Sequence, residues 1–245
     1  MTVIAHLSDV HIDGDERSAE RTLRVVRHLA GLREQIDVVL VTGDIADHGT
    51  EAEYDRARRL IDLPVPVLFC PGNHDAREPF SKVLLREPPS GAPVNRAHRI
   101  GGVLFAMCDS SIPGRNEGVL TDETLDWLDA ELTAAADLPA FVCFHHPPVE
   151  LGLPFVDGIR QFATERLSEL VARHRNVVAT LCGHAHTPAA GTFAGRPLLV
   201  APGVVSTALL PFESDELLDK GLPPMLAFHV LHPDRRLTTH YRVVA

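Results

Sequence analysis

Short apolar runs of β-type residues alternate with amphipathic, helix-type stretches along most of the chain, and this alternation constrains the fold more than any other feature. The predicted strands are Val3–Ser8, Val38–Thr42, Val65–Cys70, Val103–Cys108, Ala140–Phe144 and Val177–Cys182. The predicted helices are Ala19–Glu34, Ala52–Leu63, Asp122–Ala136 and Thr164–Arg173. Strands that alternate with helices are typical of βαβ units with parallel strands. We therefore expect a layered α/β protein.

The last part of the chain changes to a pattern of neighbouring strands. The predicted antiparallel strands are Thr192–Phe193, Pro197–Val200, Leu226–Leu231 and Leu237–Val243. The stretches Glu87–Pro93 and Pro211–Pro224 are rich in Pro and Gly and are predicted to be surface loops rather than linkers. Since there is no internal repeat either, we expect residues 1–245 to form a single domain.

The charge balance limits the kinds of partner. The chain has 23 Lys and Arg against 33 Asp and Glu, a formal net charge of −10, which argues against broad binding to nucleic acid or to an anionic membrane. No stretch approaches the roughly 20 apolar residues of a membrane span. The sequence begins MTVIAHLSDVHIDGD without a basic leader, so we expect a cytoplasmic protein. The four cysteines lie in or beside apolar runs and are expected to be reduced and buried.

Five segments each combine an apolar strand with a sudden cluster of Asp, Asn or His. They are HLSDVH, VLVTGD, VLFCPGNHD, FVCFHH and ATLCGHAH, which end at His11, Asp44, Asp75, His146 and His186. The carboxyl ends of strands in an open α/β sheet converge on one crevice, so groups that are far apart in sequence meet there. The segments therefore predict one shared site.

The residue types in these segments indicate metal binding. Imidazole and carboxylate groups without thiolates suit Zn²⁺, Mn²⁺ or Fe in an open site better than a closed structural zinc. Alternate residues of an extended segment point the same way, so Asp9 and His11 are expected to bind one ion. His184 and His186 have the same spacing, but the turn after Gly183 is expected to direct them to different ions if two are present.

These segments resemble the sequence blocks of the calcineurin-like metallophosphoesterase family, which run D-x-H, G-D, G-N-H-D, V-x-x-H and G-H-x-H in that order. The matching residues are Asp9-Val10-His11, Gly43-Asp44, Gly72-Asn73-His74-Asp75, Val142-Cys143-Phe144-His145 and Gly183-His184-Ala185-His186. Within the family, GDIADHG, PGNHDAR, MCDSSIPG and FHHPP look like the bacterial class III cyclic nucleotide phosphodiesterases. The resemblance implies a four-layer α/β/β/α sandwich of two mixed sheets, with residues from about 187 to 245 completing the second sheet.

The resemblance also implies two metal ions, drawn from Fe, Mn and Zn. One ion would be held by Asp9, His11 and His186, the other by Asn73, His145 and His184, with Asp44 bridging them. The V-x-x-H spacing selects His145 rather than His146. As neighbours on an extended segment the two should point to opposite sides, which makes His146 a supporting residue or a substrate contact.

The mechanism implied by the resemblance is attack of a metal-bridging hydroxide on the phosphorus of the substrate, with Asp44 and His74 as the catalytic residues. His74 is expected to act as general acid or to contact the phosphate, and Asp75 to orient it. The expected substrate contacts are Asn73, His74, His146 and His186. Outside this set, Asp47 is expected to cap the helix near Thr50, and the roles of His48 and Asp109 stay open.

Hydrolysis of small phosphodiesters, with 3′,5′-cyclic AMP as the first named substrate, is therefore the leading hypothesis. A glycerophosphodiesterase or broad phosphodiesterase is the alternative, because the same segments recur in those enzymes. A phosphomonoesterase or nucleotidase would need added cations; Arg77 is one candidate, although an arginine near a helix start more often lies in solvent. A non-catalytic scaffold of the same fold ranks last. Neither nucleic acid nor membrane is an expected partner, and a homodimer is one of the states that the sequence allows.

Overall fold

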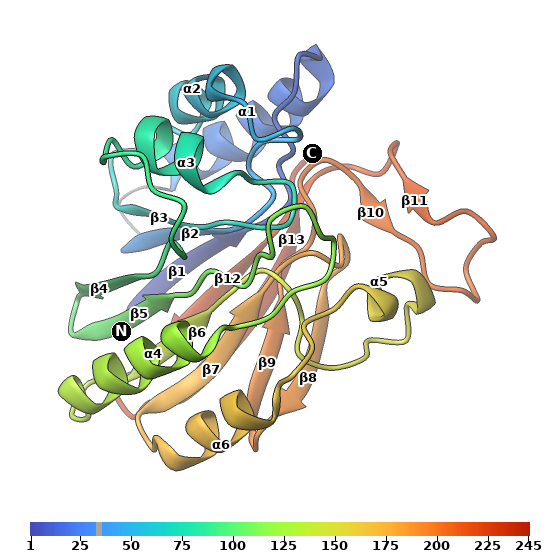
Figure 1. The fold of residues 1–245 in the computed structure, drawn as a ribbon. Helices are drawn as coiled ribbons and strands as arrows, with labels where there is room; N and C mark the ends of the chain where they lie inside the picture. The colour runs from blue at the N-terminus through green and yellow to red at the C-terminus, as the bar shows by residue number, and fades with distance from the viewer. Residues whose placement is uncertain (33–35) are drawn as a thin grey trace.

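The computed structural model describes residues 1–32 and 36–245, and two large mixed sheets form its centre (Figure 1). The first sheet has the order β13-β12-β1-β2-β3, and the second has the order β4-β5-β6-β7-β9-β8. The strands of the first sheet are β1 (Thr2–Leu7), β2 (Val38–Thr42), β3 (Val67–Cys70), β12 (Met225–Leu231) and β13 (Leu237–Val243). Those of the second are β4 (Arg96–Ile100), β5 (Val103–Met107), β6 (Ala140–Cys143), β7 (Val177–Cys182), β8 (Ala189–Phe193) and β9 (Arg196–Val200).

Helices cover the outer face of each sheet. The helices are α1 (Glu16–Gly31), α2 (Glu51–Leu60), the short α3 (Arg77–Pro79) with a π-helical turn at Phe80–Leu84, α4 (Asp122–Ala134), α5 (Pro154–Gly158) and α6 (Glu165–Arg173). One core cluster joins α1 and α2 to the first sheet, a second joins α4 and α6 to the other sheet, and a third fills the space between the sheets. The predicted four-layer α/β/β/α sandwich is confirmed.

Local sequence explains the buried strands and helices. All five residues of β2 are buried, as a near-continuous apolar run predicts for a strand that is covered on both faces. Helix α1 buries one stripe that includes Thr22, Val25 and Leu29 against its sheet. It begins three residues before the predicted Ala19, and the predicted end at Glu34 lies outside the described residues.

The C-terminal segment contributes to both sheets. Strands β8 and β9 form the predicted hairpin at the edge of the second sheet, whereas β12 pairs antiparallel with β1 in the first sheet and β13 pairs with β12. The expectation that residues 187–245 complete the second sheet is therefore wrong for β12 and β13. This pairing satisfies the backbone N–H and C=O groups on the edge of β1 that faces away from β2.

Two further findings complete the comparison with the sequence. All four cysteines are buried and are not joined by disulfides in the described structure, as expected. None of the described helices has both the length and the apolarity to cross a bilayer. A short strand, β11 (Leu218–Asp219), lies within the predicted loop Pro211–Pro224 and pairs with β10 (Thr207–Ala208), which precedes that loop.

Candidate metal centre

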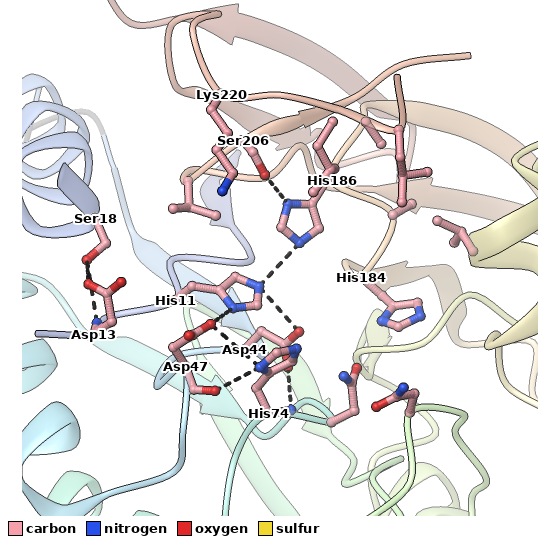
Figure 2. Close-up of a pocket in the computed structure, with 18 of the residues that line it drawn as sticks. His11, Asp13, Ser18, Asp44, Asp47, His74, His184, His186, Ser206 and Lys220 are labelled. Atoms are coloured by element: carbon pink, nitrogen blue, oxygen red, sulfur yellow. Dashed lines mark hydrogen bonds and ion pairs between the residues drawn. The ribbon is translucent and has the colours of Figure 1, made fainter. Parts of the chain in front are cut away.

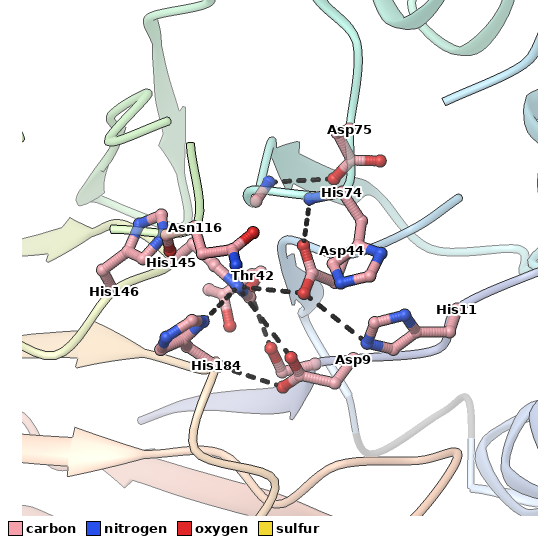
Figure 3. A network of polar contacts seen from close by, with 12 residues as sticks. Asp9, His11, Thr42, Asp44, His74, Asp75, Asn116, His145, His146 and His184 are labelled. Carbon is pink, nitrogen blue, oxygen red and sulfur yellow. Dashed lines mark hydrogen bonds and ion pairs between the residues drawn. The ribbon is translucent and has the colours of Figure 1, made fainter. Parts of the chain in front are cut away.

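The seven predicted ligands follow the carboxyl ends of five parallel strands and meet at one edge of the sandwich. Figure 3 shows five of them, Asp9, His11, Asp44, His145 and His184. Asp9 and His11 follow β1, Asp44 follows β2, Asn73 follows β3, His145 follows β6, and His184 and His186 follow β7. Strands β1, β2 and β3 are neighbours in one sheet, and β6 and β7 are neighbours in the other. Both sheets therefore supply the site, as the convergence of strand ends predicts.

The backbone at this edge is bent in a way that the sequence did not indicate. The non-glycine residues of the site with positive φ are Asp9 (55°), His11 (42°), Asp44 (49°), His184 (67°) and His186 (51°). The prediction of an extended D-V-H segment is therefore wrong, because two of its three residues adopt the left-handed conformation. Asp9 and His11 still belong to one cluster, and the unfavourable backbone concentrates where function is expected.

Two glycines permit this crowding. A Cβ atom on Gly72 would lie 2.2 Å from Oδ1 of Asp44, and one on Gly43 would lie 2.3 Å from Nδ1 of His145. Neither position has room for a side chain, so glycine in these two blocks reflects close approach of the backbone to a candidate ligand.

The first cluster contains Asp9, His11 and His186. Figure 2 shows His11 and His186 facing each other across the cavity. The Nε2 atoms of His11 and His186 lie 3.2 Å apart, and His186 Nε2 lies 3.4 Å from Asp9 Oδ1. Nδ1 of His11 donates to Oδ1 of Asp47 over 2.8 Å, which leaves the Nε2 lone pair directed into the cluster. Nδ1 of His186 is held by Oγ of Ser206 at 2.8 Å.

The second cluster is built around His145. Nδ1 of His145 donates to the carbonyl oxygen of Thr42 over 2.7 Å, so its Nε2 carries the lone pair. That Nε2 lies 3.2 Å from Nδ1 of His184. Oδ1 of Asn73 is buried and has no hydrogen-bond partner among the described residues. The second cluster thus offers imidazole nitrogens and an amide oxygen, which are the donor types expected from the sequence for a second ion.

Asp44 lies between the two clusters. Its Oδ2 is 3.5 Å from Nε2 of His11 and 3.3 Å from Nε2 of His145, while its Oδ1 accepts from the backbone N–H of His74 over 2.9 Å. A carboxylate that faces an imidazole nitrogen on each side is stabilised by positive charge, which either protons on the rings or bound cations can supply. Oδ1 of Asp9 is also buried without a hydrogen-bond partner in the described part of the chain. These atoms fit metal cations.

The pKa values of the buried groups also indicate that positive charge is favourable beside Asp44 and Asp9. Burial alone lowers the pKa of an imidazole, but Asp44 and Asp9 outweigh burial and raise the pKa of His145 to about 9. Burial and the neighbouring His145 lower the pKa of His184 to about 3. Although burial opposes it, His145 and His11 hold the pKa of Asp44 well below its usual range. Asp44 is therefore ionised.

His146 has a different environment from His145. Its Nδ1 lies 2.8 Å from Oγ of Ser110 and its Nε2 lies 3.1 Å from the carbonyl oxygen of Asn116. The side chain is fully buried, and both nitrogens are already hydrogen-bonded within the protein. This geometry supports His145 as the ligand. It argues against the predicted substrate contact of His146, which instead holds the loop at Asn116.

His74 is oriented by Asp47 rather than by Asp75. Nδ1 of His74 donates to the backbone carbonyl of Asp47 over 2.8 Å. Asp75 instead accepts from the backbone N–H groups of Ile45, Ala46 and Gly72 and from the hydroxyl of Tyr54. Burial and the Asp44 carboxylate raise the pKa of Asp75 to about 6. The prediction that Asp75 orients His74 is wrong, because Asp75 holds the loops on which Asp44 and Asn73 lie.

Two other expectations are also corrected. Thr50, not Asp47, caps α2 through a reciprocal capping box with Glu53, which leaves Asp47 free to bind His11. Arg77 is not in solvent, since its side chain is 13% exposed and its Nε donates to Oδ2 of the fully buried Asp109 over 2.8 Å. Asp109 therefore has a structural partner.

A cavity of about 410 Å³ opens at the two clusters (Figure 2). Six candidate site residues line it, namely His11, Asp44, Asn73, His74, His184 and His186. Asn116, Phe155 and Lys220 line it as well, and the sequence did not predict them. They lie in loops or in the short α5, where no strand-end pattern marks a functional residue.

Comparison with known proteins agrees with this geometry. The family model for calcineurin-like phosphoesterases matches residues 2–188. A glycerophosphodiester phosphodiesterase of Enterobacter lignolyticus is 35% identical over 93% of this chain and 86% of its own length. A cAMP/cGMP dual specificity phosphodiesterase of Mycobacterium tuberculosis is 33% identical over 84% of this chain and 68% of its own.

The fold is likewise found among solved structures. A dimetal phosphatase from Danio rerio superimposes with a TM-score of 0.73 at 17% identity, over 100% of this chain and 96% of that one. The order of the blocks, the paired clusters around Asp44, the family match and the fold all agree. This chain belongs to the calcineurin-like phosphoesterase family.

Proposed function

We propose that the protein is a dinuclear-metal phosphodiesterase of small phosphodiesters, with 3′,5′-cyclic nucleotides such as cAMP as its main substrates. The observation that carries the proposal is the position of the Asp44 carboxylate between two donor clusters at the wall of one cavity. The relative that is named for cAMP and cGMP supports the substrate class. The relative that is named for glycerophosphodiesters supports the alternative.

In this proposal Asp9, His11 and His186 would hold one ion, and Asn73, His145 and His184 would hold the other. Asp44, between the two groups, would serve both ions. Asp47, Ser206 and the carbonyl of Thr42 fix the rings of His11, His186 and His145 from behind. Such supporting hydrogen bonds set the tautomer and the direction of the ligand atom. The donor set accommodates Fe, Mn or Zn.

When bound, the two ions supply positive charge to the phosphate oxygens and lower the pKa of coordinated water toward neutrality. This local charge allows a protein of net charge −10 to attract an anionic substrate. Asn73, His74 and His186 all line the cavity and are proposed to contact the substrate.

His74 is proposed to protonate the leaving group. Because its Nδ1 donates to the carbonyl of Asp47, Nε2 carries a proton only when the ring is an imidazolium. Oδ1 of Asp47 also lies 3.6 Å from this Nδ1. Since His74 lines the cavity, its imidazolium form would present a proton at Nε2 to a leaving alkoxide.

Leaving groups of different basicity test this role. His74→Gln should lower kcat on cAMP by about 10²–10⁴-fold, because its alkoxide leaves with a proton. The same variant should retain most of its activity on bis(p-nitrophenyl) phosphate, because p-nitrophenolate leaves without one. Equal losses on both substrates would instead assign His74 to binding the phosphate.

A substrate panel with metal analysis tests the function as a whole. The protein loaded with Mn²⁺ should hydrolyse bis(p-nitrophenyl) phosphate and cAMP, with AMP turned over more slowly than cAMP. Faster turnover of AMP would favour a phosphomonoesterase. Inactivity on both diesters with Mn²⁺ bound would contradict the proposal, and inactivity with no bound metal would favour a scaffold of the same fold.

A further inference from the structure

The cavity beside the metal centre has an apolar wall, which we define as Phe155, Ile159, Leu217 and Leu218. Phe155 is 57% exposed, and Leu217 and Leu218 are 40% and 38% exposed. Apolar side chains that stay exposed and line one cavity together form the kind of patch that marks a ligand-binding groove. The mechanism proposed above assigns no role to this wall.

Helix α5 carries Phe155 at the cavity, and contacts of other residues hold the helix in place. The next residue, Val156, is 6% exposed and packs into the core cluster of the second sheet. The carboxylate of Asp157 accepts from the backbone N–H groups of Leu151 at 2.7 Å and Gly152 at 3.0 Å, which closes the preceding turn. The core contact and the turn hold α5 in place, so the Phe155 ring is available to a ligand.

The opposite part of the wall is fixed by α1. Arg17 donates through Nη2 to the carbonyl oxygens of Val205 and Lys220, on either side of Leu217 and Leu218 in sequence. The buried Arg21 donates to the carbonyl oxygens of Val204 at 2.8 Å and Leu222 at 2.7 Å. Four backbone positions of the β10–β11 region are thus tied to one helix, so its leucines have a defined position at the cavity.

We propose that the apolar wall binds the nucleobase of a nucleotide substrate whose phosphate lies at the two clusters. This inference rests on the proposed function and decides between its two substrate classes. A volume of about 410 Å³ falls in the range of roughly 300–1,000 Å³ typical of small-molecule sites. A heterocyclic base offers apolar faces to Phe155 and the leucines, whereas the hydroxyl groups of a diester such as glycerophosphoglycerol gain nothing there.

Binding of two products that differ only in the base tests the wall without requiring turnover. Calorimetry on the Mn²⁺-loaded protein would compare 5′-AMP with ribose 5-phosphate. Phe155→Ala should weaken 5′-AMP binding by about tenfold, the size expected for loss of one base–aromatic contact, and should leave ribose 5-phosphate binding unchanged. Phe212→Ala is the matched control, because Phe212 is 85% exposed in the same loop region and does not line the cavity.

Kinetics provide the second readout. The kcat/KM of Phe155→Ala should fall about tenfold on cAMP and stay unchanged on glycerophosphoglycerol, a diester with hydroxyl groups in place of a base. Equal wild-type affinity for the two products, or equal losses on both diesters, would overturn the inference. Base-dependent binding by a protein that hydrolyses no diester would contradict the proposed function and keep the base site. If Phe155→Ala does not fold, Leu218→Ser gives the same test at the β11 side of the wall.

Discussion

The two sides of the cavity are built in different ways. The metal side consists mostly of buried residues that follow the ends of sheet strands. There, a hydrogen bond to Nδ1 fixes the ring of His11, of His145 and of His186. The apolar wall comes from the five-residue α5 and the two-residue β11, and its side chains remain partly exposed. This difference indicates that the sheets determine the reaction and that the loops determine the substrate.

The difference between the two sides of the cavity can be measured in the kinetics of variants. Changes to the residues that are proposed to hold the ions should reduce turnover of every phosphodiester by a similar factor, because all of them use the same ions. Changes on the apolar wall should alter the ratio of kcat/KM values between substrates and leave metal content intact.

Asp44→Asn should have the largest effect. Loss of the charge between the clusters is expected to lower kcat on cAMP and on bis(p-nitrophenyl) phosphate by about a thousandfold, and to lower metal content. Asp15→Asn is the matched control, since Asp15 lines the same cavity and its side chain makes no capping hydrogen bond. Retention of full activity by Asp44→Asn would refute the bridging role.

Asp47→Ala should have an intermediate effect. Removing the carboxylate that holds Nδ1 of His11 should weaken Mn²⁺ affinity by about 10–100-fold on titration. Thr50→Ala separates this role from helix capping, because it should reduce the free energy of unfolding by about 1 kcal/mol while leaving Mn²⁺ affinity unchanged. The opposite pattern would restore Asp47 as the cap.

Metal removal should expose a pH dependence on the metal side alone. The pKa of His145 is raised from its ordinary 6.5 to about 9 in the folded, metal-free protein, so its protonation favours the folded state. That stabilisation is fully present below about pH 6.5 and is lost as the pH rises through about 9. The melting temperature of chelator-treated protein should fall across this range. A flat profile would show that Asp44 and Asp9 do not hold a proton on His145.

Leu218→Ser should have the smallest effect. Loss of one partly exposed leucine from the apolar wall is expected to lower kcat/KM on cAMP by about fivefold, with no change on glycerophosphoglycerol. Leu222→Ser is a suitable comparison because Leu222 is similarly exposed, at 41%, and does not line the cavity. An equal loss in both variants would point to a general effect on the loop rather than on the wall.

The convergence of the site residues was predictable because the signal is local. A polar group that follows an apolar strand, as Asp44 follows Val38–Thr42, lies at the end of that strand whatever position the strand takes in the sheet. The capping box of Thr50 and Glu53 could also be predicted from the sequence, because its pattern is a Thr followed three residues later by a Glu. Asp47 was misassigned because its nearest partner in space, His11, is 36 residues away in sequence.

Other features depend on contacts that no local pattern encodes. The pairing of β12 with β1 joins segments more than 200 residues apart, and nothing in the sequence of Met225–Leu231 indicates which of the two sheets this strand joins. The left-handed turns at Asp9 and His11 arise because the loops of two sheets crowd into one edge. Phe155 looks like an ordinary loop aromatic until its neighbours at the cavity are known.

The five left-handed residues of the metal centre also have a consequence for evolution. Each non-glycine residue in that conformation costs about 1–3 kcal/mol, and glycine at the same position avoids most of that cost. His11→Gly or His186→Gly would therefore relieve strain while removing a donor to metal. Selection for thermal stability alone would erode this edge of the protein early, so the site persists only where hydrolysis itself is under selection.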